Sequence, residues 1–151
     1  MINLDTVGAW IAPFEGSRSS AYDDANGAHI VPGYTVEGNP TVGIGINLCH
    51  PNGLDEDEIR WLFEHRVAKV AASLLQAMPW VADLTPPRQC AMIDMAYNMG
   101  LPTLQTFHTF LACMTAGNYA AAADDLAGTL WARQVGDRAV KDIAAIRGAT
   151  P

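Results

Sequence analysis

Two acidic residues near the start of the chain are candidates for proton chemistry, and Glu15 is the first. It falls in the last turn of a helix predicted over residues 3–15, where the helix dipole disfavours a carboxylate by about 0.3–1 kcal/mol. The same field, together with partial burial, raises the pKa of a carboxyl group, as a general acid requires. The alternative interpretation is an exposed glutamate at a frayed helix end.

Asp24 is the second candidate and lies nine residues later, within the stretch Ala-Tyr-Asp-Asp-Ala-Asn-Gly. A carboxylate facing Glu15 across a cleft would suit glycoside hydrolysis, in which one group protonates the leaving oxygen and the other activates water or stabilises the cationic transition state. The alternative is an Asx turn, which the Asp-x-Asn-Gly pattern also favours. The sequence alone leaves both interpretations open.

Thr41 opens the clearest predicted strand, residues 41–48. Successive side chains of a strand alternate between its faces, so Thr41 would share a face with Gly43, Gly45 and Asn47. Glycines on a strand leave room for a ligand to approach the backbone, and the threonine hydroxyl could hold a water there. The alternative is an ordinary strand residue after a proline.

The elements that must position these residues follow from the spacing of apolar residues, glycines and prolines. The predicted helix over 3–15 stops at Gly16, and the Gly- and Pro-rich residues 17–53 predict a small antiparallel sheet of hairpins. From residue 55 the pattern is helical. Asp55 and Glu58 resemble a capping box that opens a helix to about residue 78, before Pro79.

Further helices are expected in the second half of the chain. Thr85 and Pro86 favour the start of a helix that closes at Gly100, and another helix is predicted over about 104–116. Asn118 can cap the Ala-rich helix after it, and a last helix is predicted over 137–147. The predicted fold class is therefore α+β and mainly helical.

Composition excludes several classes of protein. The chain has 151 residues, half of them apolar, and a formal net charge of −7, which argues against a nucleic-acid binder. No apolar run is long enough for stable membrane insertion, and we expect no signal peptide. Cys49, Cys90 and Cys113 indicate buried thiols rather than a disulfide framework. No residues have the spacing of a metal site, and no cofactor motif is present.

Several blocks in order resemble a known family. They are Phe14-Glu15-Gly16, residues 21–27, residues 40–45, residues 94–100 with Phe107, and the C-terminal positions Ala122, Ala123, Leu126, 131–134, Arg138, Ala139, Arg147 and Gly148. Together they look like the phage-type lysozymes, or endolysins, of glycoside hydrolase family 24. The resemblance covers nearly the whole chain, and the order and spacing of the blocks make it specific.

The resemblance implies a two-lobed lysozyme-like fold in a single catalytic domain, residues 1–151. The small β-containing lobe would comprise about 16–54, and a long linking helix about 55–78. The helical lobe would comprise about 79–151 together with the helix over 3–15. A cleft would separate the lobes. Residues 28–39 are an insert relative to compact members of the family.

The family's catalytic residues fall on Glu15 as general acid, on Asp24 and on Thr41, which would position the attacking water. A wide separation of the carboxylates and inversion at the anomeric carbon would follow, although a covalent intermediate on Asp24 stays open. The family's C-terminal arginine falls on Arg138, where it can pair with Glu15. Substrate-binding or supporting roles are expected for eight further residues: Tyr34, Gly43, Gly45, Tyr97, Asn98, Phe107, Trp131 and Gln134. For the aromatic residues Tyr97, Phe107 and Trp131, packing in the core is the alternative.

The expected function is an endolysin muramidase that hydrolyses the β-1,4 bond between N-acetylmuramic acid and N-acetylglucosamine in peptidoglycan, for host cell lysis. The alternatives are a non-catalytic cell-wall-binding or phage tail module and an enzyme of the same fold acting on chitin or chitosan. We expect a monomer whose partner is the peptidoglycan glycan strand. It would be made in the host cytoplasm and released by a holin to act on the cell wall in the periplasm.

Overall fold

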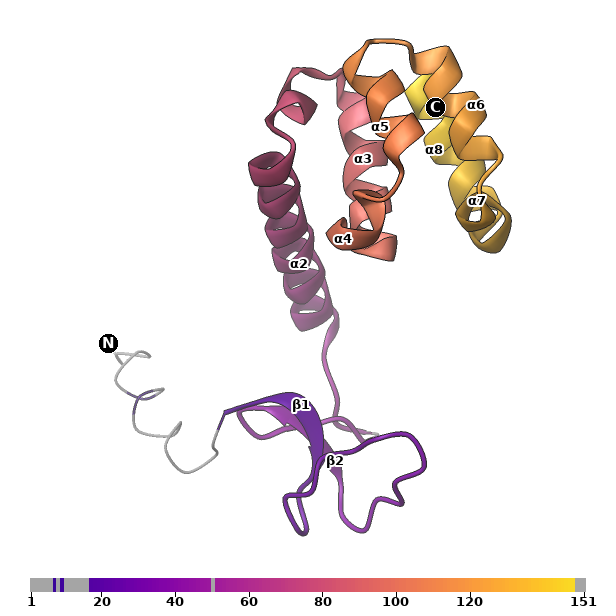
Figure 1. Cartoon of the computed structure of the whole chain (residues 1–151). Helices are drawn as coiled ribbons and strands as arrows, with labels where there is room; N and C mark the ends of the chain where they lie inside the picture. The colour runs from indigo at the N-terminus through magenta and orange to yellow at the C-terminus, as the bar shows by residue number, and fades with distance from the viewer. Residues whose placement is uncertain (1–6, 8, 10–16, 50, 149–151) are drawn as a thin grey trace. The chain divides into compact units, whose positions relative to one another are not determined.

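The computed structural model describes residues 7, 9, 17–49 and 51–148 (Figure 1). The chain divides into two compact units, Met1–Arg60 and Trp61–Pro151, and the division falls inside a long helix. Of the predicted helix over 3–15, the structure describes only residues 7 and 9, which are helical, and Glu15 lies outside the described residues. The predicted fold class, α+β and mainly helical, is confirmed.

The first unit contains a three-stranded antiparallel sheet with the order β1-β2-β3. Strand β1 spans Arg18–Asp23, β2 spans Pro40–Gly43 and β3 spans Ile46–Asn47. Tyr22 pairs with Thr41 and Asp23 pairs with Pro40. Asp24 therefore directly follows the end of β1, and Thr41 lies near the start of β2, so the pairing of the two strands brings these two candidate site residues to the same end of the sheet.

The prediction of one continuous strand over residues 41–48 is wrong. The chain reverses at Ile44 and Gly45, and Val42 pairs with Ile46 across the hairpin. Gly43 and Gly45 have φ of +67° and +69°, which glycine adopts without the steric cost of a side chain. A tight hairpin keeps the alternation of apolar residues, so the period-2 pattern could not reveal the turn.

Helix α2 spans Glu56–Ala77 and begins at the predicted capping box. The Glu58 backbone N–H donates to Asp55 Oδ1 over 2.8 Å, and the Asp55 N–H donates to Glu58 Oε2 over 2.9 Å. These bonds satisfy two backbone donors that the first turn of a helix leaves free. Pro79 then opens η1, a short 3-10 helix over Pro79–Asp83.

The remaining helices form the rest of the second unit. They are α3 (Pro86–Met99), α4 (Leu101–Leu104), α5 (His108–Thr115), α6 (Tyr119–Ala127), α7 (Leu130–Val135) and α8 (Asp137–Arg147). The predicted helix over 104–116 is shorter than expected, because a turn closed by Phe107 N–H on Leu104 O separates α4 from α5. The predicted cap on α6 is present, since Asn118 Oδ1 accepts from Ala121 N–H over 3.3 Å.

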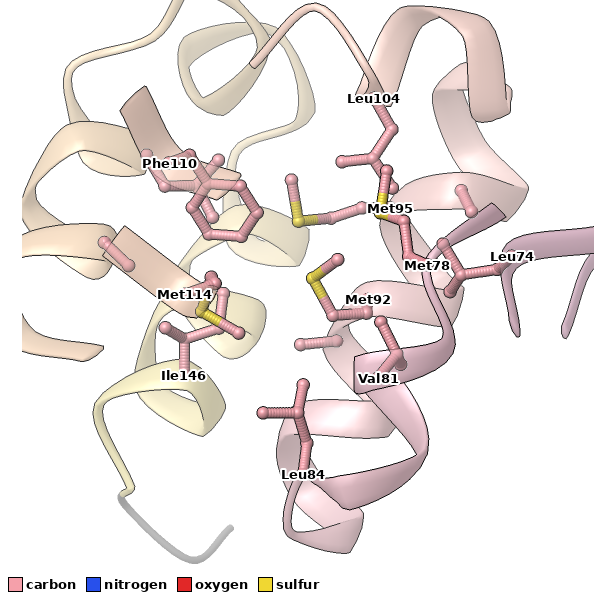
Figure 2. Close-up of a cluster of buried hydrophobic side chains, with 14 of the residues drawn as sticks. Leu74, Met78, Val81, Leu84, Met92, Met95, Leu104, Phe110, Met114 and Ile146 are labelled. Atoms are coloured by element: carbon pink, nitrogen blue, oxygen red, sulfur yellow. The ribbon is translucent and has the colours of Figure 1, made fainter. Parts of the chain in front are cut away.

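The hydrophobic core of the second unit is rich in methionine (Figure 2). Met92 and Met95 come from α3, Phe110 and Met114 from α5, and all are at most 1% exposed. Flexible thioether side chains fill irregular gaps between short helices. This core holds α3 and α8, which carry Asp94 and Arg138, against the other helices of the unit.

Two further properties concern the surface of the described part of the chain. None of the helices there combines the length and the apolar character needed to cross a bilayer. Cys90 is exposed, whereas Cys49 and Cys113 are half-buried. The expectation of buried thiols is therefore wrong, because Cys90 lines an open groove between α3 and α8 instead of packing in the core.

Candidate active site

Asp24 is held by a single residue of the neighbouring chain segment. Asn39 N–H donates to Asp24 Oδ1 over 2.6 Å, and Asn39 Nδ2 donates to Asp24 Oδ2 over 2.9 Å. Hydrogen bonds to a carboxylate stabilise its charged form. These bonds, first that from the Asn39 backbone, hold the pKa of Asp24 below its usual value. An exposed carboxylate with both oxygens fixed in this way is ionised at neutral pH.

Thr41 is connected to the same residue. Its Oγ1 donates to the Asn39 carbonyl oxygen over 3.2 Å, and the Asp24 backbone N–H donates to that oxygen over 3.1 Å. Thr41 is 4% exposed, so its rotamer is restricted by its surroundings. Because the hydroxyl proton is used in this bond, Thr41 Oγ1 keeps lone pairs that can accept from a water or a substrate hydroxyl.

Asp23, the residue beside the predicted site aspartate, has a different role. Its side chain is completely buried and accepts from the backbone N–H groups of Glu37 at 2.7 Å and Gly38 at 2.9 Å. It also accepts from Ala25 N–H at 3.1 Å. The Glu37 N–H is the main reason that the pKa of Asp23 is lowered despite its burial. Asp23 therefore anchors the end of the 28–39 insert to the turn after β1.

The insert is packed closely against this turn. A Cβ atom on Gly38 would overlap Asp24 Oδ1 and would lie 2.9 Å from the Ala25 backbone nitrogen. Glycine is required there because the backbone approaches so closely. The Tyr34 hydroxyl lies 3.2 Å from Asp23 Oδ2 and accepts from Asn26 Nδ2 over 2.9 Å. Tyr34, an expected substrate-binding residue, thus contacts the anchor of the insert.

Arg138 forms an ion pair in the second unit. Its Nε donates to Asp94 Oδ2 over 2.7 Å and its Nη2 donates to Asp94 Oδ1 over 2.8 Å. The pairing with Glu15 that the resemblance implies concerns a residue outside the described part of the chain. Asp94 and Asp142 also line a mainly apolar groove of about 740 Å³ between α3 and α8.

Asp142, beside this pair, is a buried acid. It is 4% exposed, and its Oδ2 has no hydrogen-bond partner among the residues that the structure describes. Burial, and next the nearby charge of Asp94, raise the pKa of Asp142 to about 7. The Arg138 guanidinium has the opposite effect on Asp94, whose pKa it lowers.

The structure also locates the other expected binding residues. Trp131 is 8% exposed and belongs to the core, and its Nε1 donates to Asn98 Oδ1 over 2.8 Å. Phe107 is half-buried and packs against the core. Tyr97 is 37% exposed and meets Phe63 edge to face, with 5.9 Å between ring centroids. Trp131 and Phe107 therefore pack in or against the core, as the alternative interpretation of these aromatic residues predicts.

The remaining expected residues differ in their surroundings. Gln134 is exposed on α7. A Cβ atom on Gly43 would meet only Ile46 Cδ1, at 3.7 Å, so turn geometry rather than a close approach explains this glycine. Within the described ranges, histidine, cysteine and acidic side chains form no cluster of three suited to a metal ion.

Sequence reasoning missed Asn39 and Asp23 as parts of the site. The Gly-Asn-Pro run at 38–40 indicates a turn, but a turn signal does not say which carboxylate the asparagine meets. The Asp-Asp pair at 23–24 offers two candidates, and only the fold shows that one is buried and the other exposed.

The fold and these contacts can be compared with known families. No curated protein sequence matches the chain. A protein-family model described as phage lysozyme matches residues 12–148, a range that includes Glu15, Asp24, Thr41 and Arg138. Members are peptidoglycan hydrolases of the lysozyme type. Because the match covers most of its length, the chain belongs to the phage lysozyme family.

Proposed function

We propose that this protein is an N-acetylmuramidase that cleaves the β-1,4 bond between N-acetylmuramic acid and N-acetylglucosamine in peptidoglycan. One observation carries the assignment of Asp24. Its carboxylate is kept ionised by Asn39, which also accepts a hydrogen bond from Thr41. An ionised carboxylate that shares its hydrogen-bond partner with a hydroxyl bearing free lone pairs is suited to orient a water that must lose a proton.

In the proposed mechanism, Glu15 is the general acid that protonates the leaving oxygen. Asp24 accepts a proton from the attacking water while Thr41 Oγ1 accepts a hydrogen bond from the same water. The oxygens of Asp24 are already engaged with Asn39, which supports a role in positioning water rather than covalent attack. Attack by water from the far side of the sugar ring gives inversion at the anomeric carbon.

The bond cleaved can be read from the products of purified peptidoglycan. After borohydride reduction, a muramidase yields muramitol at the new ends, a glucosaminidase yields glucosaminitol, and a lytic transglycosylase yields anhydro-muramic ends. We expect muramitol, with the inverted anomer detected by NMR during the first turnovers. Chitin and chitosan serve as competing substrates, and faster cleavage of either would overturn the substrate assignment.

The roles of the acids are tested by isosteric variants. We expect Glu15→Gln and Asp24→Asn each to lose at least about 100-fold in rate, the lower range for general acid–base catalysis. Glu64→Gln and Asp57→Asn remove the same charges from exposed positions on α2 and are the matched controls. Glu15→Gln with the wild-type rate would remove Glu15 from the mechanism. A wild type no more active than either variant would indicate a binding module.

We further propose a role in host cell lysis. The protein would act as a monomer on the cell wall in the periplasm, after release from the cytoplasm through a holin. A turbidity assay on Gram-negative cells stripped of their outer membrane tests this role. Wild-type protein should clear the suspension and Glu15→Gln should not.

A further inference from the structure

Asn39 is the residue through which two candidate catalytic residues are joined. It makes four hydrogen bonds to them: its N–H and Nδ2 donate to the two oxygens of Asp24, and its carbonyl oxygen accepts from Asp24 N–H and Thr41 Oγ1. Asp24 lies after β1 and Thr41 lies in β2. Among the described residues, the side chains of Asp24 and Thr41 make no direct hydrogen bond to each other. Asn39 therefore connects them.

We propose that Asn39 is a positioning residue that fixes the Asp24 carboxylate and the Thr41 hydroxyl in one arrangement for the attacking water. The inference rests on the proposed function, because the water and its attack belong to that reaction. Asn39 itself need not touch the substrate. It acts by fixing the direction of the lone pairs that Asp24 and Thr41 present.

The insert over residues 28–39 is built to deliver Asn39 to this place. Buried Asp23 accepts from the N–H groups of Glu37 and Gly38, the two residues before Asn39. Gly38 has no side chain at the point where one would overlap Asp24 Oδ1. The anchor at Asp23 and the close approach at Gly38 together restrict where Asn39 can lie. Restricting a positioning residue in this way reduces the conformational entropy lost when the reacting groups are aligned.

The two donors of Asn39 can be separated by mutation. Asn39→Ala keeps the backbone N–H that donates to Asp24 Oδ1 and removes only the donor to Asp24 Oδ2. Asn39→Asp has nearly the same shape as asparagine but replaces that donor with a carboxylate oxygen. A role in filling space would survive Asn39→Asp. A role in holding the Asp24 carboxylate would not, because a like charge disfavours its ionised form.

The first measurement is the pKa of Asp24 in the intact protein. It is obtained from a pH titration in which carbon-13 NMR monitors the carboxyl carbon, and the Asp24 signal is assigned by its absence in Asp24→Asn. We expect Asn39→Ala to raise this pKa by about half a unit to one unit, and Asn39→Asp to raise it further. Asn26→Ala is the matched control. Its amide bonds to Tyr34 and Glu37 in the same insert but not to Asp24, so the pKa should stay at the wild-type value.

The second measurement is the pH profile of kcat/KM on purified peptidoglycan, whose acid limb reports the ionisation of the base in the free enzyme. We expect the acid limb of Asn39→Ala to move up with the pKa of Asp24. We also expect kcat to fall about 10-fold with KM little changed, since alignment matters most in the transition state. Asn39→Asp should be slower than Asn39→Ala at pH 7.

The outcomes separate this inference from the proposed function. An unchanged pKa of Asp24 in Asn39→Ala, or the same shift in Asn26→Ala, would overturn the inference whatever the activity. If the pKa of Asp24 shifts as expected in the Asn39 variants but the wild type does not cleave peptidoglycan, the muramidase assignment fails. The effect of Asn39 on Asp24 would then stand as a local property of the structure. Thermal unfolding of each variant shows whether the chain is folded during these measurements.

Discussion

Arg138 binds both oxygens of Asp94 with two nitrogens of its guanidinium, across 44 residues of sequence. Bidentate pairs of this kind are stronger than single charged contacts, because two parallel hydrogen bonds fix the geometry. The pair joins α8 to α3, and Asp142 lies beside it with a raised pKa. The helical unit therefore contains two carboxyl groups next to one guanidinium.

The stability of the protein should depend on Asp142 at neutral pH. The pKa of Asp142 in the folded chain is about 7, above its ordinary 3.8, so the folded chain holds this proton more tightly than the unfolded chain. The contribution of Asp142 to the free energy of unfolding is therefore greatest below about pH 4. It falls as the pH rises towards 7 and is lost above 7. We expect Asp142→Asn to be more stable than wild type at pH 8, by about 1–3 kcal/mol after allowance for solvent screening.

This prediction is checked by urea unfolding of both proteins from pH 4 to pH 9. Carboxylates with a lowered pKa, such as Asp23 and Asp94, have the opposite pH dependence: their contribution to the free energy of unfolding is lost as the pH falls. Because both proteins contain these carboxylates, the difference between the two proteins isolates the effect of Asp142. A difference that is the same at pH 4 and pH 8 would contradict the assignment of Asp142 as a buried acid.

Removal of the Arg138 guanidinium should lower the stability of the folded protein. Arg138→Ala leaves the Asp94 carboxylate beside Asp142 without its partner, which we expect to cost about 1–3 kcal/mol in the free energy of unfolding. Arg147→Ala is the control. The Arg147–Asp124 pair is more exposed, with side chains 51% and 69% accessible against 37% for both Arg138 and Asp94. Its loss should cost less than about 1 kcal/mol. Equal losses in urea unfolding would contradict the structural role of Arg138.

Two glycines of the same insert should differ in their effect on activity. Gly38→Ala forces a Cβ atom against Asp24 Oδ1 and Ala25, so we expect cleavage of peptidoglycan to be largely lost. Gly33→Ala meets open space but has φ of +87°, so it should lower stability by about 1 kcal/mol and retain activity. Rates and thermal unfolding of both variants test this contrast, and full activity in Gly38→Ala would refute the close approach.

The bond between Asn98 and Trp131 should matter for stability rather than for substrate binding. Asn98→Ala removes the acceptor of the indole N–H of Trp131, a core residue that is 8% exposed. A buried donor left without a partner costs about 1–3 kcal/mol. We therefore expect a lower melting temperature with an unchanged KM on peptidoglycan. A raised KM at unchanged stability would contradict this prediction and would support a role of Asn98 and Trp131 in substrate binding.

Features that depend on neighbours in sequence were determined by the sequence itself. The capping box of Asp55 and Glu58, the cap at Asn118 and the helix over 137–147 are all present in the structure. Each rests on contacts within about one helical turn, where residue types and spacing define the geometry. The order of the blocks around Glu15, Asp24 and Thr41 likewise sufficed to indicate the family that the comparison later showed.

Other features were decided only by the tertiary structure. Asn39 meets Asp24 across 15 residues, Trp131 meets Asn98 across 33, and Arg138 meets Asp94 across 44. No local pattern specifies such partners, because they depend on which strands pair and which helices pack together. The same holds for the two neighbouring aspartates. Asp23 and Asp24 are chemically identical in the sequence, and only the folding of the insert over β1 buries one carboxylate and leaves the other exposed to solvent.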